Sequence, residues 1–147
     1  MKKAVTANIC ILMIILLTAG AHARPAKDST QIEELFEQRI AILNHYYGGK
    51  MAFEDARSNI EKLVSGPLLE EDVRLMKAFD ASGVDQVADY DLNLVSCKRS
   101  SYGIIKGQAD IYWVMQGENG RWETEESYFY TAENKGDCIK LTQLTKN

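Results

Sequence analysis

Few side chains in this sequence have the type and spacing that catalysis requires. His45 is the one histidine beyond residue 23, because His22 lies in a stretch with the features of a signal peptide. An H-E-x-x-H motif or a multi-histidine centre cannot be built from it, so we predict no metal site. The motifs G-x-S-x-G, G-x-x-x-x-G-K-[ST], G-x-G-x-x-G and C-x-x-C are also absent. These absences argue against the common hydrolase, nucleotide-binding and redox sites, and we expect no cofactor.

Aromatic residues supply the candidates for a pocket. They fall on or beside the apolar faces of the expected helices and strands, where they pack in a core or line a cavity. The four pocket candidates are Tyr46, Tyr47, Tyr90 and Trp113. His45 lies roughly opposite the apolar stripe of its helix, and we expect it to be solvated.

A second candidate site is a surface on the third expected strand. Acidic residues are densest there, at Glu123, Glu125 and Glu126, with Arg121 beside them. Such a run is a solvated strand face or a docking surface for a basic partner, because aromatic residues among charges are common at protein contacts. The candidate contact residues are Trp122, Glu123, Glu125 and Phe129.

The N-terminus has the order of a secretory signal. Lys2 and Lys3 precede an apolar run over Ile9–Leu17, and small residues follow up to Ala21-His22-Ala23. We predict cleavage after Ala23, which leaves a domain over residues 24–147 and directs it out of the cytoplasm. The alternative is a retained membrane anchor, because residues 4–23 carry no charge.

The remaining 124 residues (147 − 23) fit one domain with its own core. Their formal charge is (17 − 2) − 21 = −6, because the removed segment holds two lysines and no acid. An acidic domain is unsuited to nucleic acid or to anionic lipid, so we expect neither as a partner. In an exported protein Cys97 and Cys138 are disulfide candidates, and two separate thiols are the alternative.

Helices are expected first. Apolar residues recur at helical spacing from Ile32 to Tyr47, after a capping-box pattern at Thr30–Glu33 and before Gly48-Gly49. A second helix is expected from Phe53 to Val64, ending at Gly66-Pro67. A third carries Leu69, Val73, Met76 and Phe79, has Glu70, Glu71 and Asp72 near its start, and ends at Ser82-Gly83.

Strands follow, because the apolar period changes to two from Val87 onward. We predict strands around residues 88–95, 109–115, 122–130 and 139–144, with a hairpin turn at Asn119-Gly120. The last strand should contain a bulge, because the spacing of its apolar residues slips from two to three between Leu141 and Leu144. The predicted class is α+β, with three N-terminal helices packed on a curved four-stranded antiparallel sheet.

This order of elements resembles the NTF2-like superfamily. The resemblance rests on a long first helix ending in Tyr46-Tyr47, a glycine bend, a helix opening Phe53-Glu54-Asp55-Ala56, and long antiparallel strands. It implies a cone-shaped fold with a pocket between helices and sheet. That family usually has a short strand or hairpin between its second and third helices, where this sequence has only Gly66-Pro67-Leu68-Leu69. A cystatin-like arrangement is the alternative.

The resemblance also implies one enzymatic scheme. Enzymes of that superfamily use an aspartate base in the cone with an oxyanion-stabilising tyrosine. Asp110 with Tyr112, and Asp91 with Asn93, share strand faces, but alternation places those faces opposite the apolar ones. We therefore expect a non-enzymatic module that binds an unidentified protein or small ligand. A small-molecule enzyme of isomerase or dehydratase type is the alternative.

Overall fold

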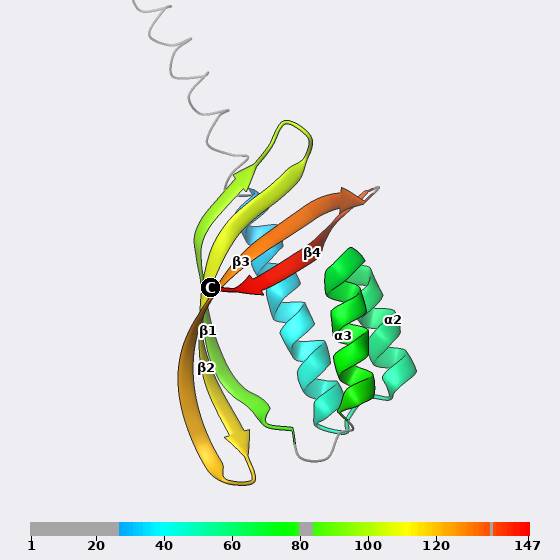
Figure 1. Cartoon of the computed structure of the whole chain (residues 1–147), viewed down its shortest axis with the longest axis vertical. Helices are drawn as coiled ribbons and strands as arrows, with labels where there is room; N and C mark the ends of the chain where they lie inside the picture. The colour runs from blue at the N-terminus through cyan, green and yellow to red at the C-terminus, as the bar shows by residue number, and fades with distance from the viewer. Residues whose placement is uncertain (1–26, 80–83, 136) are drawn as a thin grey trace, which may run out of the picture.

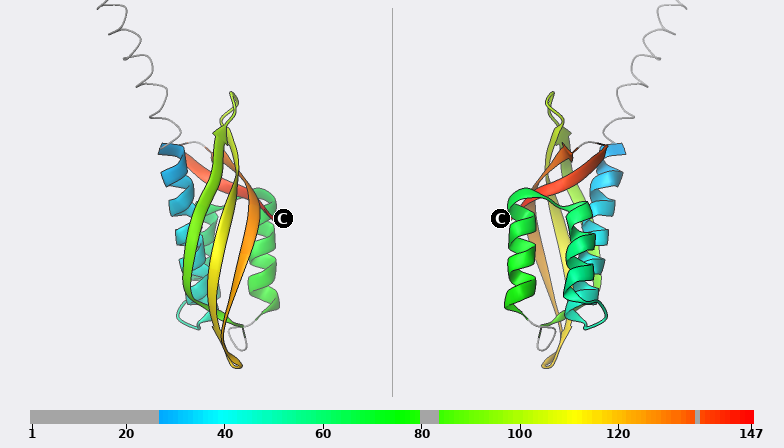
Figure 2. Two further views of the ribbon diagram at one scale, coloured as in Figure 1. Left: turned by 90° about the vertical axis from the view of Figure 1, so that its left-hand side faces the viewer. Right: turned by 90° about the vertical axis from the view of Figure 1, so that its right-hand side faces the viewer.

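Among the described residues, three helices lie on one face of a four-stranded antiparallel sheet, which confirms the predicted α+β class. The computed structural model describes residues 27–79, 84–135 and 137–147. The strands lie in the sequential order β1-β2-β3-β4, and the helices cover one face of the curved sheet (Figure 1). In the left view of Figure 2 the strands lie in front and none of the described helices covers them, whereas in the right view the helices lie in front of the sheet. We call the helix-covered face concave and the other face convex.

The helices begin and end close to the predicted residues, with two differences. The first helix is already formed at residue 27 and continues to 47, so Thr30 lies inside it and the capping-box pattern does not mark its start. α2 spans Phe53–Leu63. α3 spans Gly66–Ala78, with Pro67 in its first turn. Gly66-Pro67 therefore begins α3, because proline fits the first turn of a helix, where its missing N–H costs no hydrogen bond. The predicted end at Ser82-Gly83 lies outside the described residues.

The strands are longer than the apolar pattern indicated. β1 spans Gln86–Arg99, β2 Ile104–Gly117, β3 Gly120–Lys135 and β4 Cys138–Lys146. The predicted bulge in the last strand is confirmed: Thr131 pairs with Gln143 and Ala132 with Leu141, which leaves Thr142 as the extra residue. The bulge turns both Leu141 and Leu144 toward the core cluster.

The core lies between the concave face and the helices. Its fully buried side chains include Phe36 of the first helix, Ile60 of α2 and Tyr130 of β3, and the rings of Phe36 and Tyr130 meet edge to face at 5.7 Å. A parallel bridge from Val64 to Leu141 joins the α2–α3 connection to β4. β4 is short and pairs with β3 only from Tyr128 to Lys135, so this well-packed region sits at one end of the sheet (Figure 1).

The predicted disulfide is wrong. Cys97 and Cys138 are both free, Cys97 half-buried and Cys138 exposed. Cys97 pairs with Gly107 of β2, Gly107 with Tyr130 of β3, and Tyr130 with Leu144 of β4. Cys138 therefore lies three strands across and six residues along from Cys97. The sequential strand order keeps the two cysteines on opposite edges of the sheet, too far apart for a disulfide.

The predicted signal, residues 1–23, lies outside the described residues. Among the helices that the structure describes, none is long and apolar enough to span a membrane.

Candidate binding cavity on the concave face

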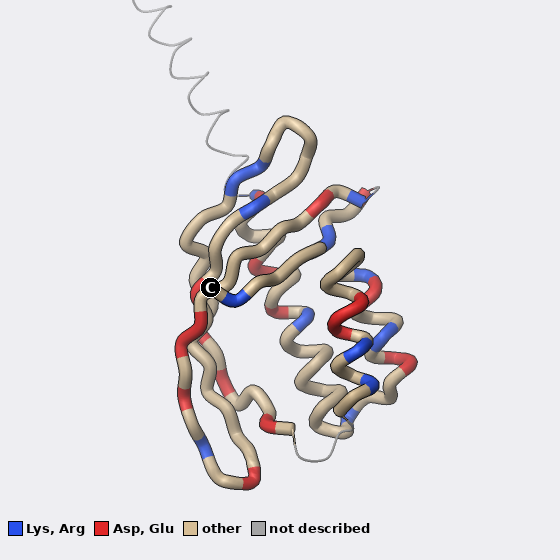
Figure 3. Tube along the Cα trace, in the orientation of Figure 1, with Lys and Arg blue, Asp and Glu red and all other residues tan. Residues whose placement is uncertain are grey.

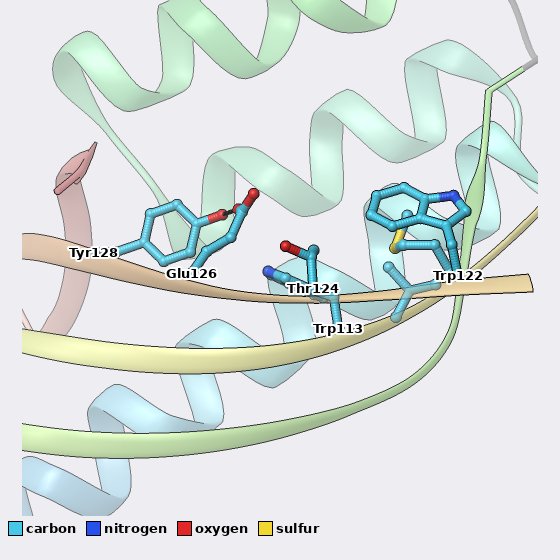
Figure 4. Close-up of a pocket in the computed structure, with 7 residues that line it drawn as sticks. Trp113, Trp122, Thr124, Glu126 and Tyr128 are labelled. Atoms are coloured by element: carbon cyan, nitrogen blue, oxygen red, sulfur yellow. Dashed lines mark hydrogen bonds between the residues drawn. The ribbon is translucent and has the colours of Figure 1, made fainter.

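A cavity opens on the concave face beside the part of β3 that has no pairing with β4. Its volume is about 190 Å³, and three strands contribute to its wall. The lining side chains are mostly apolar or aromatic: Val87, Trp113, Met115, Trp122, Thr124, Glu126 and Tyr128. In Figure 4, Trp122 stands at one end, Tyr128 and Glu126 at the other, and Thr124 between them. Strand alternation explains the arrangement, because Trp122, Thr124, Glu126 and Tyr128 are every second residue of β3.

The indole of Trp122 is held by a hydrogen bond at its polar edge. Its Nε1 donates to Oδ2 of Asp85 at 2.8 Å, while the side chain remains 45% exposed. Asp85 reaches this position because Gly117 leaves room for it: a Cβ on Gly117 would lie 1.8 Å from Oδ1 of Asp85. A glycine at the end of β2 thus permits the contact that orients the exposed tryptophan.

At the opposite end of the cavity, Glu126 is an ionised carboxylate with two donors. It accepts hydrogen bonds from the Tyr128 hydroxyl and from Nζ of Lys146, the latter at 2.5 Å. Burial alone would raise the pKa of Glu126, but these two hydrogen bonds and the charge of Lys146 together hold it below its ordinary value. Burial, together with the hydrogen bond to Glu126 and its negative charge, raises the pKa of Tyr128 to about 12.

The raised pKa of Tyr128 predicts a loss of stability in alkali. An unfolded tyrosine ionises near pH 10, whereas folded Tyr128 keeps its proton to about pH 12. The folded state then binds the extra proton, so this contribution is complete below pH 10 and is lost as the pH rises toward 12. Denaturant unfolding on both sides of pH 10 should show wild type losing stability relative to Tyr128→Phe.

The control for this experiment is Tyr102→Phe, which removes a phenol whose side chain is 90% exposed. A difference between wild type and Tyr128→Phe that stays constant above pH 10 would contradict the raised pKa.

A second hollow adjoins the cavity toward α3. Its volume is about 500 Å³, and it shares Met115 with the cavity. Its other lining residues are Tyr47, Leu75, Phe79, Val84 and Asp85. The concave face near the β2–β3 turn is therefore incompletely filled on both sides of Met115.

The structure distributes the four aromatic pocket candidates over different places. Trp113 lines the cavity, and Tyr47 lines the second hollow. Tyr90 packs against Trp113, with ring centroids 6.2 Å apart. The Tyr46 hydroxyl donates to the Met76 carbonyl at 2.6 Å, which joins the first helix to α3. One of the four thus borders the cavity directly, and Tyr90 supports it from β1.

The four surface candidates divide between the two faces of the sheet. Trp122 lies on the concave face in the cavity wall. Glu123, Glu125 and Phe129 alternate with the cavity-lining residues, so they lie on the convex face, where all three are exposed. The Tyr112 hydroxyl donates to Glu123. His45 is exposed, as predicted.

Glu126 and Tyr128 are the site residues that sequence reasoning missed. The sequence groups Glu126 with Glu123 and Glu125 as one acidic run, although alternation along β3 places it on the face of Trp122 and Tyr130. A signal was therefore present: one acid replaces an apolar residue in the period-two pattern of a strand. Among the described residues, no three His, Cys, Asp or Glu side chains group as metal ligands.

The fold and the cavity define an α+β protein with an open apolar hollow on the concave face of its sheet. No family model matches the chain, and no curated protein matches it. Among solved structures, it is similar to the crystal structure of the intermembrane space region of the chloroplast protein ARC6, with a TM-score of 0.60 and 13% identity. The match covers 81% of this chain and 95% of that one. At this identity the similarity shows a shared fold alone.

Proposed function

We propose that this chain is an exported, non-enzymatic binding module whose cavity takes up an apolar group of a protein partner or small ligand. The observation that supports it is the cavity itself: about 190 Å³, open to the surface, with an exposed tryptophan at one end and a hydrogen-bonded carboxylate at the other. Binding sites have this make-up, with mostly apolar walls and a few placed polar groups. The signal-like order of residues 2–23 supports export.

Binding is favoured over catalysis by the state of Glu126. A carboxyl group that transfers protons near neutral pH needs a raised pKa. The pKa of Glu126 is lowered, because hydrogen bonds from Lys146 and Tyr128 outweigh its burial. The carboxylate is thus stabilised as an anion and suits recognition of a donor or a cation.

The alternative, a small-molecule enzyme related to the NTF2-like superfamily, is favoured by one observation. A carboxylate and a tyrosine hydroxyl share a hydrogen bond in an open cavity on the concave face of the sheet. If this pair performs catalysis, Glu126→Gln abolishes turnover of a substrate that still binds. If it serves recognition, the same change weakens binding of cationic ligands and leaves neutral ones unaffected.

Benzyl alcohol is a suitable probe of the cavity, because a cavity of this volume accommodates a single aromatic ring. Both tryptophans of the chain, Trp113 and Trp122, line the wall, so their indole N–H signals in NMR report directly on occupancy. We expect saturable shifts of both signals, with a dissociation constant of about 1 mM, as for other small fragments.

Two neighbouring substitutions test where the probe binds. Thr124→Phe fills the middle of the cavity and should abolish the shifts. Glu125→Phe adds the same ring one residue along, on the convex face, and should preserve them. Equal effects of the two variants, or no saturable shift in the wild type, would contradict the proposed function.

A further inference from the structure

Half of β3 has a free edge directly beside the cavity. β2 pairs with β3 along its whole length down to Gly120, whereas β4 pairs with it only as far as Tyr128. The last bond on the β4 side runs from the Asn147 N–H to the Ser127 carbonyl at 2.9 Å. No described strand pairs with residues 120–126 on that side.

The direction of the main-chain groups on this edge follows from alternation. Ser127 and Thr131 both turn their carbonyls toward β4, where they accept from the Asn147 N–H and the Thr142 hydroxyl. Because successive residues of a strand point their N–H and C=O groups to opposite sides, Glu123 and Glu125 also point theirs toward the free edge. β3 pairs with β2 in continuous register throughout this stretch. The edge therefore offers a regular set of donors and acceptors.

The other edge of the sheet is protected in ways that this segment is not. β1 has two irregularities in register, at Val87/Asp89 and Leu94/Ser96. The Asn44 side chain also binds both the N–H and the carbonyl of Val87, at 2.8 and 2.9 Å. A bulge is one usual means of preventing strand pairing at an edge, and charged side chains on the edge are another. Residues 120–126 carry charges, at Arg121, Glu123, Glu125 and Glu126, but their pairing with β2 contains no bulge. Acidic side chains oppose pairing with a strand of like charge and favour pairing with a basic one.

The chemistry around the free edge differs between the two faces. On the convex face, Arg121, Glu123 and Glu125 border the edge, and further acids on β1 and β2 make this region acidic on balance: Asp89, Asp91 and Asp110. Figure 3 shows acidic positions gathered along this part of the sheet. On the concave face the same segment presents Trp122, Thr124 and the cavity. A strand added here would place alternate side chains in an acidic and in an apolar environment.

One lysine–glutamate pair already joins β3 to its neighbouring strand on this side of the sheet. Lys146, near the end of β4, reaches along the sheet and binds Glu126 of β3 at 2.5 Å. A lysine from the neighbouring strand thus neutralises an acid of β3 at the point where β4 ends.

We propose that an extended, basic segment of a partner protein binds residues 120–126 as an added antiparallel strand, continuing the line of β4. Its central pattern is Lys/Arg–apolar–Lys/Arg, with the basic residues opposite Glu123 and Glu125 and the apolar residue opposite Thr124, directed into the cavity. Strand addition of this kind takes affinity from main-chain hydrogen bonds and specificity from alternate side chains. The part played by the apolar residue rests on the proposed function.

A second copy of this chain fits the edge less well. Pairing two free edges would bring Glu123 and Glu125 of one molecule against the same residues of the other, and like charges directly opposite each other destabilise a strand pair. The acidic edge therefore favours a basic partner over self-association.

The test uses short synthetic peptides and the full domain. The peptide Thr-Lys-Phe-Lys-Thr, blocked at both ends, should bind in calorimetric titration, and Thr-Glu-Phe-Glu-Thr should not. In Glu123→Lys/Glu125→Lys the preference should reverse to the glutamate peptide. Unchanged preference in the reversed variant would overturn the assignment of the acidic pair.

N-methylation separates strand pairing from simple charge attraction. In the proposed register the lysine N–H groups face β3 and the phenylalanine N–H faces away. Methylating both lysine nitrogens should weaken binding about tenfold or more, because two main-chain hydrogen bonds are lost. Methylating the phenylalanine nitrogen should leave affinity unchanged. Equal effects of the two modifications would overturn strand addition.

Failure of this inference is distinguishable from failure of the proposed function. If benzyl alcohol shifts the indole signals but the lysine peptide does not bind, the cavity is a binding site and the free edge is not. If the lysine peptide binds with the expected N-methyl pattern and Thr124→Phe has no effect on it, the edge binds the strand without using the cavity. Loss of both responses removes both proposals.

Discussion

Asp72→Ala should destabilise the protein by about 3–5 kcal/mol, the usual cost of removing one partner from a buried ion pair. Asp72 is 1% exposed. Its two carboxylate oxygens accept from the guanidinium of Arg39, Oδ2 from Nε at 2.9 Å and Oδ1 from Nη2 at 2.5 Å. Alanine would leave that guanidinium, whose side chain is 15% exposed, without its anion. The pair joins the first helix to α3, so its loss also loosens their packing.

Denaturant unfolding measures this effect, and the chain supplies a matched control. Glu71 is the preceding residue of α3 and pairs with Arg74, but both side chains are more than half exposed. Glu71→Ala should change the free energy of unfolding by no more than about 0.5 kcal/mol, as is usual for exposed pairs. Replacing both partners, as in Arg39→Met/Asp72→Leu, should recover much of the loss because no charge stays buried. Equal costs for Asp72→Ala and Glu71→Ala would contradict the prediction.

Asp72 illustrates which features of the helices could be predicted from the sequence and which could not. The sequence places Asp72 among three acids near the start of a helix, yet it lies four residues from both Leu68 and Met76, on the buried face of α3. A buried acid on that face was thus predictable. Its partner was not, because Arg39 is 33 residues away and meets it only through the packing of two helices.

The sheet shows the same division between local pattern and long-range arrangement. The spacing of Leu141 and Leu144 predicted the bulge, because a bulge is a local change of period. The disulfide prediction failed because it depended on strand order and offset, which no local pattern specifies. The cavity lies beside the part of β3 that β4 does not pair with, and no local pattern specifies where that pairing ends. Sequence could therefore identify Trp113 and Trp122 as candidates without showing that they border the same space.

Gly107→Ala should cost about 3 kcal/mol, at the upper end of the usual range for overpacking a core. Gly107 is the fourth residue of β2 and pairs with Cys97 of β1 on one side and with Tyr130 of β3 on the other. A Cβ there would lie 1.9 Å from the Ser96 carbonyl oxygen and 2.4 Å from the Tyr130 hydroxyl. That hydroxyl donates to the Ser96 carbonyl at 2.8 Å directly across the glycine. The added methyl group must therefore displace a backbone carbonyl and break a buried hydrogen bond together.

Tyr130→Phe separates the two contributions, because it removes the hydroxyl and keeps the ring. It should cost about 1 kcal/mol, the usual value of one hydrogen bond. The double variant should be close in stability to Gly107→Ala alone, since the methyl group already breaks the bond that phenylalanine lacks. Full additivity would mean that the methyl group leaves this bond intact. A Gly107→Ala variant within about 0.5 kcal/mol of wild type, the range of ordinary surface changes, would mean that β1 yields at Ser96, where its register is already irregular.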